Sequence, residues 1–181
     1  MNRILLCCSF IILMASCINE QESLQVIHDR ELQTITDYLQ NTPLPSVRTE
    51  RDGATGIAII WQEENVNGRR PAIGDSLRVN YTGSFFDGRI FDTSIDSVAR
   101  ANNIHNASRK YEPLKISLGR TSLIQGFNFG VFNMKEGDKA IVLIPSAYAY
   151  GTAGSSSIPP NTPLRFDLEL VEIMTEEEIE I

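Results

Sequence analysis

Apolar and polar residues alternate in several short runs after Gly56, with the period of two that a half-buried β-strand requires. The clearest run covers residues 164–170, where the charged Arg165, Asp167 and Glu169 separate four apolar side chains. A strand that is apolar on one face and charged on the other is typical of an antiparallel sheet covered on one side. The same pattern, or a short apolar run, predicts further strands at 57–61, 77–81, 114–118 and 139–144.

A turn and one helix complete the predicted domain. Asp87-Gly88 stands between two apolar pairs, Phe85-Phe86 and Ile90-Phe91, and this arrangement predicts a hairpin. From 123 to 134 the apolar residues follow helical spacing, and Gly137 stands where helices commonly end. We therefore predict an α+β domain in which one short helix packs on the apolar face of one antiparallel sheet.

An amphipathic helix is predicted ahead of the sheet, over residues 24–39. Its apolar positions fall loosely at helical spacing, and the run 41–45, with two prolines, stops it. One amphipathic helix cannot bury its own face, so it packs on the main domain, pairs with a copy of itself or stays loosely formed. The predicted organisation is a tether and this helix at 17–56, the main domain at 57–175 and an acidic tail at 176–181.

The first sixteen residues have the composition of a signal peptide. Arg3 supplies a positive charge, and an apolar run from 4 to 14 is too short to span a bilayer. Met14-Ala-Ser-Cys17 resembles a bacterial lipobox, although Leu is commoner than Met at its first position. We predict a lipoprotein signal peptide at 1–16, lipidation of Cys17 and attachment to a membrane of the bacterial cell envelope, on its periplasmic or outer-membrane face. The alternative is an ordinary secretory signal with an incidental cysteine.

Composition excludes several classes of function. The formal charge is −7 with a sequence pI near 4.9, and no basic face is visible, which argues against a nucleic-acid partner. Cys7 and Cys8 lie in the segment to be removed, so the mature chain has no cysteine pair for a disulfide or redox motif. His28 and His105 are too few and too separated for a metal site or a triad. We therefore predict no cofactor and no metal.

Residues 147–160, AYAYGTAGSSSIPP, carry the strongest candidate chemistry. Tyr148 and Tyr150 combine a large apolar ring with a hydroxyl, which suits the wall of a half-open pocket. A loop of Gly, Ala and Ser follows, and then a double proline that cannot continue a strand. Taken alone, the segment is equally compatible with a surface loop between two core strands.

Six segments in order resemble the FKBP-type peptidyl-prolyl cis-trans isomerases. They are Val79-Asn-Tyr-Thr-Gly83, Phe86-Asp-Gly-Arg-Ile-Phe-Asp-Thr-Ser94, Leu123-Ile-Gln-Gly-Phe127, Met134-Lys-Glu-Gly-Asp138, Ala147-Tyr-Ala-Tyr-Gly151 and Ile158-Pro-Pro160. The resemblance covers residues 57–174 and implies a five- to six-stranded antiparallel sheet wrapped on one short helix. The N-terminal part, a lipobox followed by a short helix, resembles the exported bacterial members of the family.

The resemblance also implies a site. In this family a proline ring enters an aromatic pocket and the X-Pro bond rotates without a nucleophile, metal or general base. The corresponding catalytic positions are Tyr81, Asp92, Ile124, through its backbone N–H, and Tyr150. The positions that hold the substrate are Phe91, Leu123, Phe127, Ile158 and Phe166. Each phenylalanine alone is also what an ordinary core would contain.

Three departures qualify this picture. Phe127 stands where the best-known members have Trp. The loop 152–157 is one residue shorter than the corresponding loop of the family. Residues 95–113 form an insertion between Ser94 and Leu114, predicted to make a helical turn over the pocket rim. The insertion leaves the pocket arginine of the family unassigned between Arg100 and Arg109.

The expected function is catalysis of X-Pro rotation in proline-containing polypeptides, assisting the folding of exported proteins. The alternatives are a weakly active or inactive FKBP-like module that binds peptides as a chaperone, and a purely structural lipoprotein. The resemblance implies macrolide ligands as well, and it leaves open a homodimer formed through the N-terminal helix.

Overall fold

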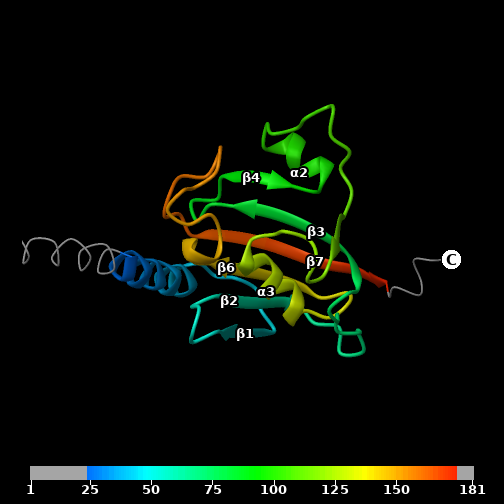
Figure 1. Cartoon of the computed structure of the whole chain (residues 1–181), viewed down its shortest axis with the longest axis horizontal. Helices are drawn as coiled ribbons and strands as arrows, with labels where there is room; N and C mark the ends of the chain where they lie inside the picture. Colours follow the sequence, from blue (N-terminus) through cyan, green and yellow to red (C-terminus); the bar gives the residue numbers. More distant parts are fainter. Residues whose placement is uncertain (1–23, 175–181) are drawn as a thin grey trace, which may run out of the picture.

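The computed structural model describes residues 24–174. It contains a seven-stranded antiparallel sheet with the strand order β1-β2-β6-β7-β3-β4, and β5 pairs with β3 (Figure 1). This confirms the predicted α+β class and its antiparallel sheet. The strands are β1 (Arg48–Arg51), β2 (Ala58–Glu63), β3 (Ser76–Ser84), β4 (Ile90–Thr93), β5 (Leu114–Ser117), β6 (Lys139–Ile144) and β7 (Leu164–Met174).

The strand β1 was not predicted, and it falls within the region assigned to the tether and N-terminal helix. Its sequence, Arg-Thr-Glu-Arg, has no apolar residue and therefore gives no alternation to detect. It pairs along its length with the buried strand β2, with Arg48 opposite Trp61 and Arg51 opposite Ala58. Backbone hydrogen bonds to a neighbouring strand thus make a strand from a polar segment.

The central strand β6 contributes apolar side chains to the cores on both faces of the sheet. Ala140, Val142 and Ile144 belong to the core under the concave face, whereas Ile141 and Leu143 belong to a second core on the opposite face. Successive side chains of a strand point to opposite faces, so an unbroken apolar run indicates burial on both sides. We call these the inner core and the outer core.

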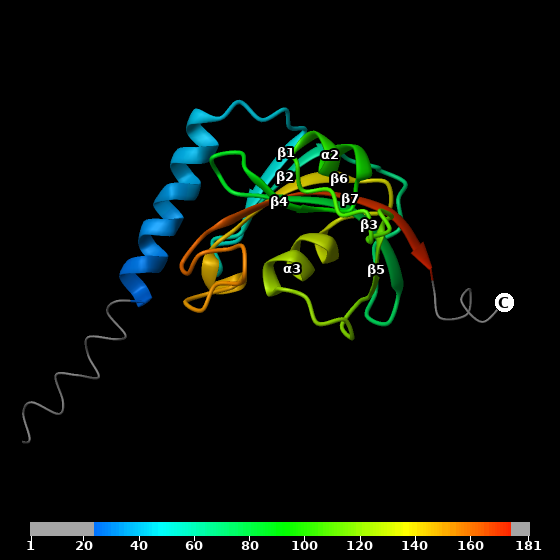
Figure 2. The same cartoon turned by 90° about the horizontal axis from the view of Figure 1, so that it is seen from above.

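The helix α3 (Gln125–Asn133) lies in the concave face of the sheet (Figure 2). It is the predicted short helix, shorter by a few residues than the apolar spacing indicated. It approaches β6 very closely, because a Cβ atom on Gly126 would stand 2.2 Å from Ile144 and one on Gly130 would stand 2.8 Å from Val142. Glycine is thus required on the face of α3 that meets the sheet.

The N-terminal helix is present and runs over residues 24–41 of the described chain. It packs on the outer face, where Ile35 is fully buried among Ala58, Ile60, Ile141 and Leu143. The ring of Tyr38 adds a tilted contact with Phe86 at 4.6 Å between centroids. Of the three arrangements left open by the sequence, packing on the main domain is the one observed.

A third helix, α2 (Asp96–Ala101), forms in the insertion beside β4. The predicted helical turn therefore exists, and the buried Ala99 anchors it. No helix within residues 24–174 is long and apolar enough to cross a membrane. The predicted signal peptide, Cys17 and the acidic tail lie outside the described residues.

Candidate active site

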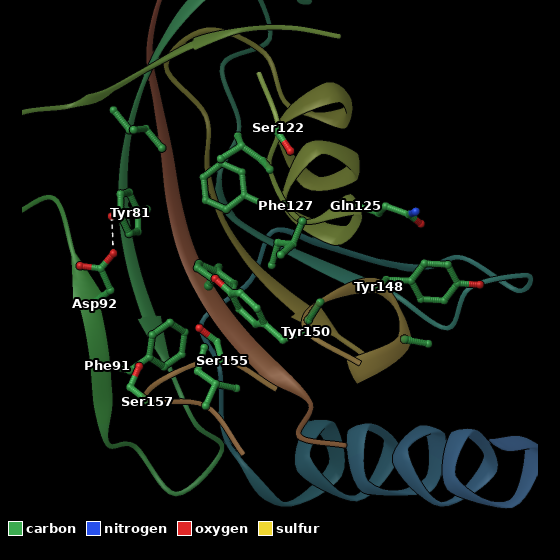
Figure 3. A pocket seen from close by; sticks show the side chains of 17 residues that line it. Tyr81, Phe91, Asp92, Ser122, Gln125, Phe127, Tyr148, Tyr150, Ser155 and Ser157 are labelled. Atoms are coloured by element: carbon green, nitrogen blue, oxygen red, sulfur yellow. Dashed lines mark hydrogen bonds between the residues drawn. The ribbon is translucent and has the colours of Figure 1, made fainter. Parts of the chain in front are cut away.

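A cavity of about 660 Å³ opens between α3, the strands β3 and β4, and the segment 147–158 (Figure 3). The nine residues proposed for catalysis or substrate binding all line it, although they come from five separate segments of the chain. They are Tyr81, Phe91, Asp92, Leu123, Ile124, Phe127, Tyr150, Ile158 and Phe166.

The interior of the cavity is aromatic. Phe127 on α3 meets Tyr81 edge-on at 6.0 Å and Phe166 edge-on at 5.4 Å, and Phe166 meets Phe91 at 5.7 Å. These edge-to-face contacts are favourable for aromatic pairs and fix each ring in one orientation. Gly83 makes room for them, since a Cβ atom there would stand 2.6 Å from Phe91. The result is a rigid apolar surface shaped by ring faces and edges.

One wall carries a polar group of three side chains. The hydroxyl of Tyr81 donates to Asp92 at 2.6 Å and accepts from Nη2 of Arg109 at 2.9 Å. Arg109 also forms an ion pair with Asp92 through Nη1. Burial, followed by the hydrogen bond to Asp92, raises the pKa of Tyr81 to about 12. Tyr81 therefore stays protonated and serves as a fixed donor rather than as a base.

The structure also decides between the two candidate arginines. Arg109 reaches back from the insertion to Asp92 and Tyr81, whereas Arg100 pairs with Asp96 on the exposed side of α2. The ring of Tyr111 lies 5.3 Å from the guanidinium carbon of Arg109. Residues 95–113 do not line the cavity, so the insertion acts on the site through Arg109 rather than by covering the rim as predicted.

Two hydrogen-bond donors belong to residues that line the cavity. The backbone N–H of Ile124, directly before α3, has no protein acceptor among the described residues. The side chain of Tyr150 lies across the cavity in Figure 3, whereas Tyr148, which also lines the cavity, directs its hydroxyl away from Tyr150 and Phe127. Tyr150 is 36% exposed, and its partial burial together with the charge of Asp92 raises the pKa of its hydroxyl. Both donors are thus available to a ligand carbonyl.

Several residues at the edge of the cavity were not predicted from the sequence. Most of them are small or polar and had no motif to mark them, although the serine-rich loop was noted as a feature. They are Leu114, Ser122, Gln125, Ala147, Ala149, Ser155 and Ser157. No group of three or more His, Cys, Asp or Glu in residues 24–174 is arranged to hold a metal ion.

Comparison with known proteins gives a consistent picture. The sequence model of the FKBP-type peptidyl-prolyl cis-trans isomerases matches residues 67–171. Peptidyl-prolyl cis-trans isomerase FKBP4 of Mus musculus is 31% identical over 157 residues, which cover 82% of this chain and 31% of the relative. FKBP-type peptidyl-prolyl cis-trans isomerase FkpA of Escherichia coli K12 is 37% identical over 123 residues, which cover 68% of this chain and 40% of the relative. The chain thus spans less than half the length of these relatives.

Two solved structures share the fold. The crystal structure of FkpA from Escherichia coli matches with a TM-score of 0.62 at 25% identity, covering 96% of this chain and 71% of that one. A peptidyl-prolyl cis-trans isomerase from Pseudomonas syringae pv. tomato matches with a TM-score of 0.59 at 25% identity, covering 84% of this chain and 96% of that one.

Proposed function

The chain belongs to the FKBP-type peptidyl-prolyl cis-trans isomerase family, and from that premise we propose that its aromatic cavity catalyses rotation about X-Pro peptide bonds. One observation carries the proposal. An apolar interior built on Phe127 is bordered by two donors, the Ile124 N–H and the Tyr150 hydroxyl, that have no protein acceptor among the described residues. This combination suits a proline ring flanked by carbonyl groups.

The proposed catalysis of X-Pro rotation requires an apolar environment and no chemically reactive side chain. Amide resonance opposes rotation with a barrier of about 18–20 kcal/mol. Resonance separates charge and water stabilises that separation, so an apolar surface weakens the planar form relative to the twisted one. With the ring against Phe127, the Ile124 N–H and the Tyr150 hydroxyl hold the substrate carbonyls while the prolyl bond turns. Asp92 orients Tyr81 and balances the charge of Arg109 beside the pocket.

A protease-coupled assay on a Leu-Pro peptide tests the activity. We expect a rate above the uncatalysed one, and we expect Tyr150→Phe and Asp92→Val to lower it while the domain stays folded. Tyr38→Phe is the matched control, because Tyr38 lies on the outer face and does not line the cavity. A correctly folded protein without any catalysed rate would refute the enzymatic proposal.

The second candidate function is a peptide-binding module with little turnover, and the identity of Phe127 favours it. Phe127 offers less contact area than the Trp of the best-known members and has no N–H, so binding with slow turnover is a coherent outcome. Calorimetry with a prolyl peptide, and competition by a macrolide such as rapamycin, measures this binding independently of rate. A saturable affinity without turnover would select the chaperone-like module, and no affinity at all would leave a structural lipoprotein.

We further propose that the protein works on exported polypeptides from a lipid anchor at Cys17. The support is the lipobox-like sequence Met14-Ala-Ser-Cys17 behind an apolar run. Uncatalysed X-Pro isomerisation takes tens to hundreds of seconds, so exported clients with proline would profit from a catalyst at the envelope. Mass spectrometry of the membrane-bound protein should find a lipidated Cys17, and Cys17→Ser should release the chain from the membrane fraction. Retention of Cys17→Ser in the membrane would contradict the anchor.

We also propose that the N-terminal helix can form a homodimer. The buried side of the helix already packs on the outer core, which leaves Leu24 and Val26 as exposed apolar side chains for a second copy. Sedimentation velocity over a range of concentrations decides it, with a concentration-dependent dimer expected if those residues pair. A monomer at all concentrations would remove the proposal.

A further inference from the structure

The N-terminal helix contacts the cavity wall through a buried carboxylate. Glu31 is only 4% exposed, although glutamate is almost never fully buried without partners. Its Oε2 accepts the backbone N–H of Ser146 at 2.7 Å, and its Oε1 accepts the Ser146 hydroxyl at 2.6 Å. The two residues are 115 positions apart in the chain, so this contact is made only by the tertiary fold.

Ser146 is the first residue of the segment that presents Tyr150. It begins the short 3₁₀ helix η1 (Ser146–Tyr148), and its carbonyl accepts the N–H groups of Ala149 at 2.9 Å and Gly151 at 2.8 Å. The hydrogen bonds of Ser146 therefore span the segment on both sides of Tyr150. A shift of Ser146 would move the backbone that carries the Tyr150 hydroxyl.

The helix makes a second contact with the same segment. The ring of His28, one turn before Glu31, meets the ring of Tyr148 edge-on at 6.5 Å between centroids. Tyr148 lines the cavity at its edge, with its hydroxyl directed away from Tyr150, so the helix contacts the cavity wall at this residue as well (Figure 3). The N-terminal helix thus supports the cavity wall from behind, at two successive turns.

The energetics favour a defined position for this wall. Hydrogen bonds to an ionised acceptor are stronger than neutral ones, and a buried carboxylate that loses its donors is severely penalised. Glu31 must therefore stay on Ser146 as long as the helix stays on the sheet. The helix itself is held on the sheet by Ile35 in the outer core, so Glu31 and the apolar core make separate contributions that can be varied independently.

We propose that Glu31 is a positioning residue of the prolyl cavity, which holds the Tyr150-bearing segment in place through Ser146. It does not touch substrate. The consequence is that the N-terminal helix is an integral part of the catalytic unit rather than a spacer. The proposal rests on the proposed isomerase function only for its kinetic readout, and its structural readout is independent of activity.

The test compares four variants in the full chain. Glu31→Ala removes both hydrogen bonds, and Ser146→Ala removes only the one made by the hydroxyl. Glu31→Gln is the conservative rescue, because its amide can still accept the Ser146 N–H and donate to the hydroxyl. Ile35→Val is the matched control for stability, since it thins the helix packing on the outer core without touching the segment at 146–151.

We expect Glu31→Ala to lower kcat/KM about tenfold, because a small misplacement of a catalytic group is costly. Ser146→Ala should fall between wild type and Glu31→Ala, and Glu31→Gln and Ile35→Val should stay close to wild type. If Glu31 acts through Tyr150, adding Tyr150→Phe to Glu31→Ala should lower the rate less than the two single effects combined. If Glu31→Ala does not fold, Ser146→Ala carries the same test alone.

Hydrogen exchange supplies the readout that does not need turnover. The amides of Ala149 and Gly151 should exchange faster in Glu31→Ala than in Ile35→Val at equal global stability. If Glu31→Ala leaves both the exchange rates and kcat/KM unchanged, the positioning role is overturned. The same holds if Ile35→Val loses as much kcat/KM and exchange protection as Glu31→Ala does. If the wild type itself shows no turnover, the proposed function fails, and exchange together with prolyl-peptide affinity still decides the role of Glu31.

Discussion

One helix packs on each face of the central sheet, yet the cavity lies on the inner face alone. On the outer face the N-terminal helix buries Ile35 completely against apolar residues of β2 and β6. On the inner face α3 is nine residues long and leaves uncovered the aromatic side chains that line the cavity. The N-terminal helix fills the apolar patch of β2 and β6 and so contributes stability, whereas α3 leaves part of the apolar inner face open to a ligand.

The two sides also differ in whether their polar groups have hydrogen-bond partners within the protein. On the inner side, Tyr81, Asp92 and Arg109 form a network at the cavity, and two donors are left for a substrate. At the outer helix, the buried Glu31 has both oxygens occupied by Ser146. A buried donor without an acceptor is an energetic loss, whereas a donor in an open cavity can bond to water until a ligand replaces the water. Changes in the apolar outer core should therefore act on stability, whereas changes at the cavity, or at the Glu31–Ser146 contact behind its wall, should act on rate.

The largest effect is expected from Ile35→Ala in the outer core. Truncation of a fully buried isoleucine leaves a cavity and should cost about 2–5 kcal/mol of unfolding free energy. Denaturant titration followed by the fluorescence of the single, buried Trp61 measures it. The kcat/KM of the folded fraction should stay near wild type, and a large loss of kcat/KM at unchanged stability would break the comparison.

Alkaline pH should reveal the inner network. The pKa of Tyr81 is raised to about 12 in the folded protein, above its ordinary value of 10. The folded state therefore holds this proton more tightly than the unfolded state. The contribution is fully present below pH 10 and is lost as the pH rises toward 12, by about 2 kcal/mol. Unfolding titrations of wild type and Tyr81→Phe measure it, and parallel pH profiles for both proteins would contradict the assignment.

Asp92→Asn should separate rate from stability. It removes the charge that pairs with Arg109 and orients Tyr81, so we expect kcat/KM to fall about tenfold, equivalent to about 1.4 kcal/mol. The ion pair is partly exposed, so the unfolding free energy should change by less than about 1 kcal/mol. Asp87→Asn is the matched control, an exposed carboxylate in the same hairpin that pairs with Arg89. Equal rates for both variants would show that Asp92 has no role in the site.

The smallest effect is expected from Tyr38→Phe at the edge of the outer face. The Tyr38 hydroxyl accepts a hydrogen bond from Arg165 at 2.9 Å, but Arg165 retains its ion pair with Asp167. The loss should be about 0.5–1 kcal/mol, since a donor that keeps another acceptor is not left unsatisfied. Thermal unfolding detects a change of this size. A loss of stability as large as that of Ile35→Ala would mean that the packing of the helix depends on the Arg165–Tyr38 hydrogen bond and not on the apolar outer core.

Much of the fold could be read from local patterns because one-sided burial leaves a period in the sequence. The alternation of β7 and the Asp87-Gly88 turn were predicted and are observed, with Phe85 and Arg89 hydrogen-bonded across the turn at 2.9 Å. The strand β1 could not be predicted, because pairing with β2, not its own residues, makes it a strand. Arg109 could not be chosen over Arg100, because the path of the insertion decides which guanidinium returns to Asp92.

The sequence by itself determined the class of fold, the central helix and, through the resemblance of its motifs, nine of the residues that line the cavity. Periodicity and motif order are local properties, so a chain displays them before it folds. Only the tertiary structure decided that the N-terminal helix packs on the outer core and that Glu31 meets Ser146 behind the cavity wall. Contacts between residues so far apart depend on the summed geometry of every intervening strand and turn, and no local pattern encodes that sum.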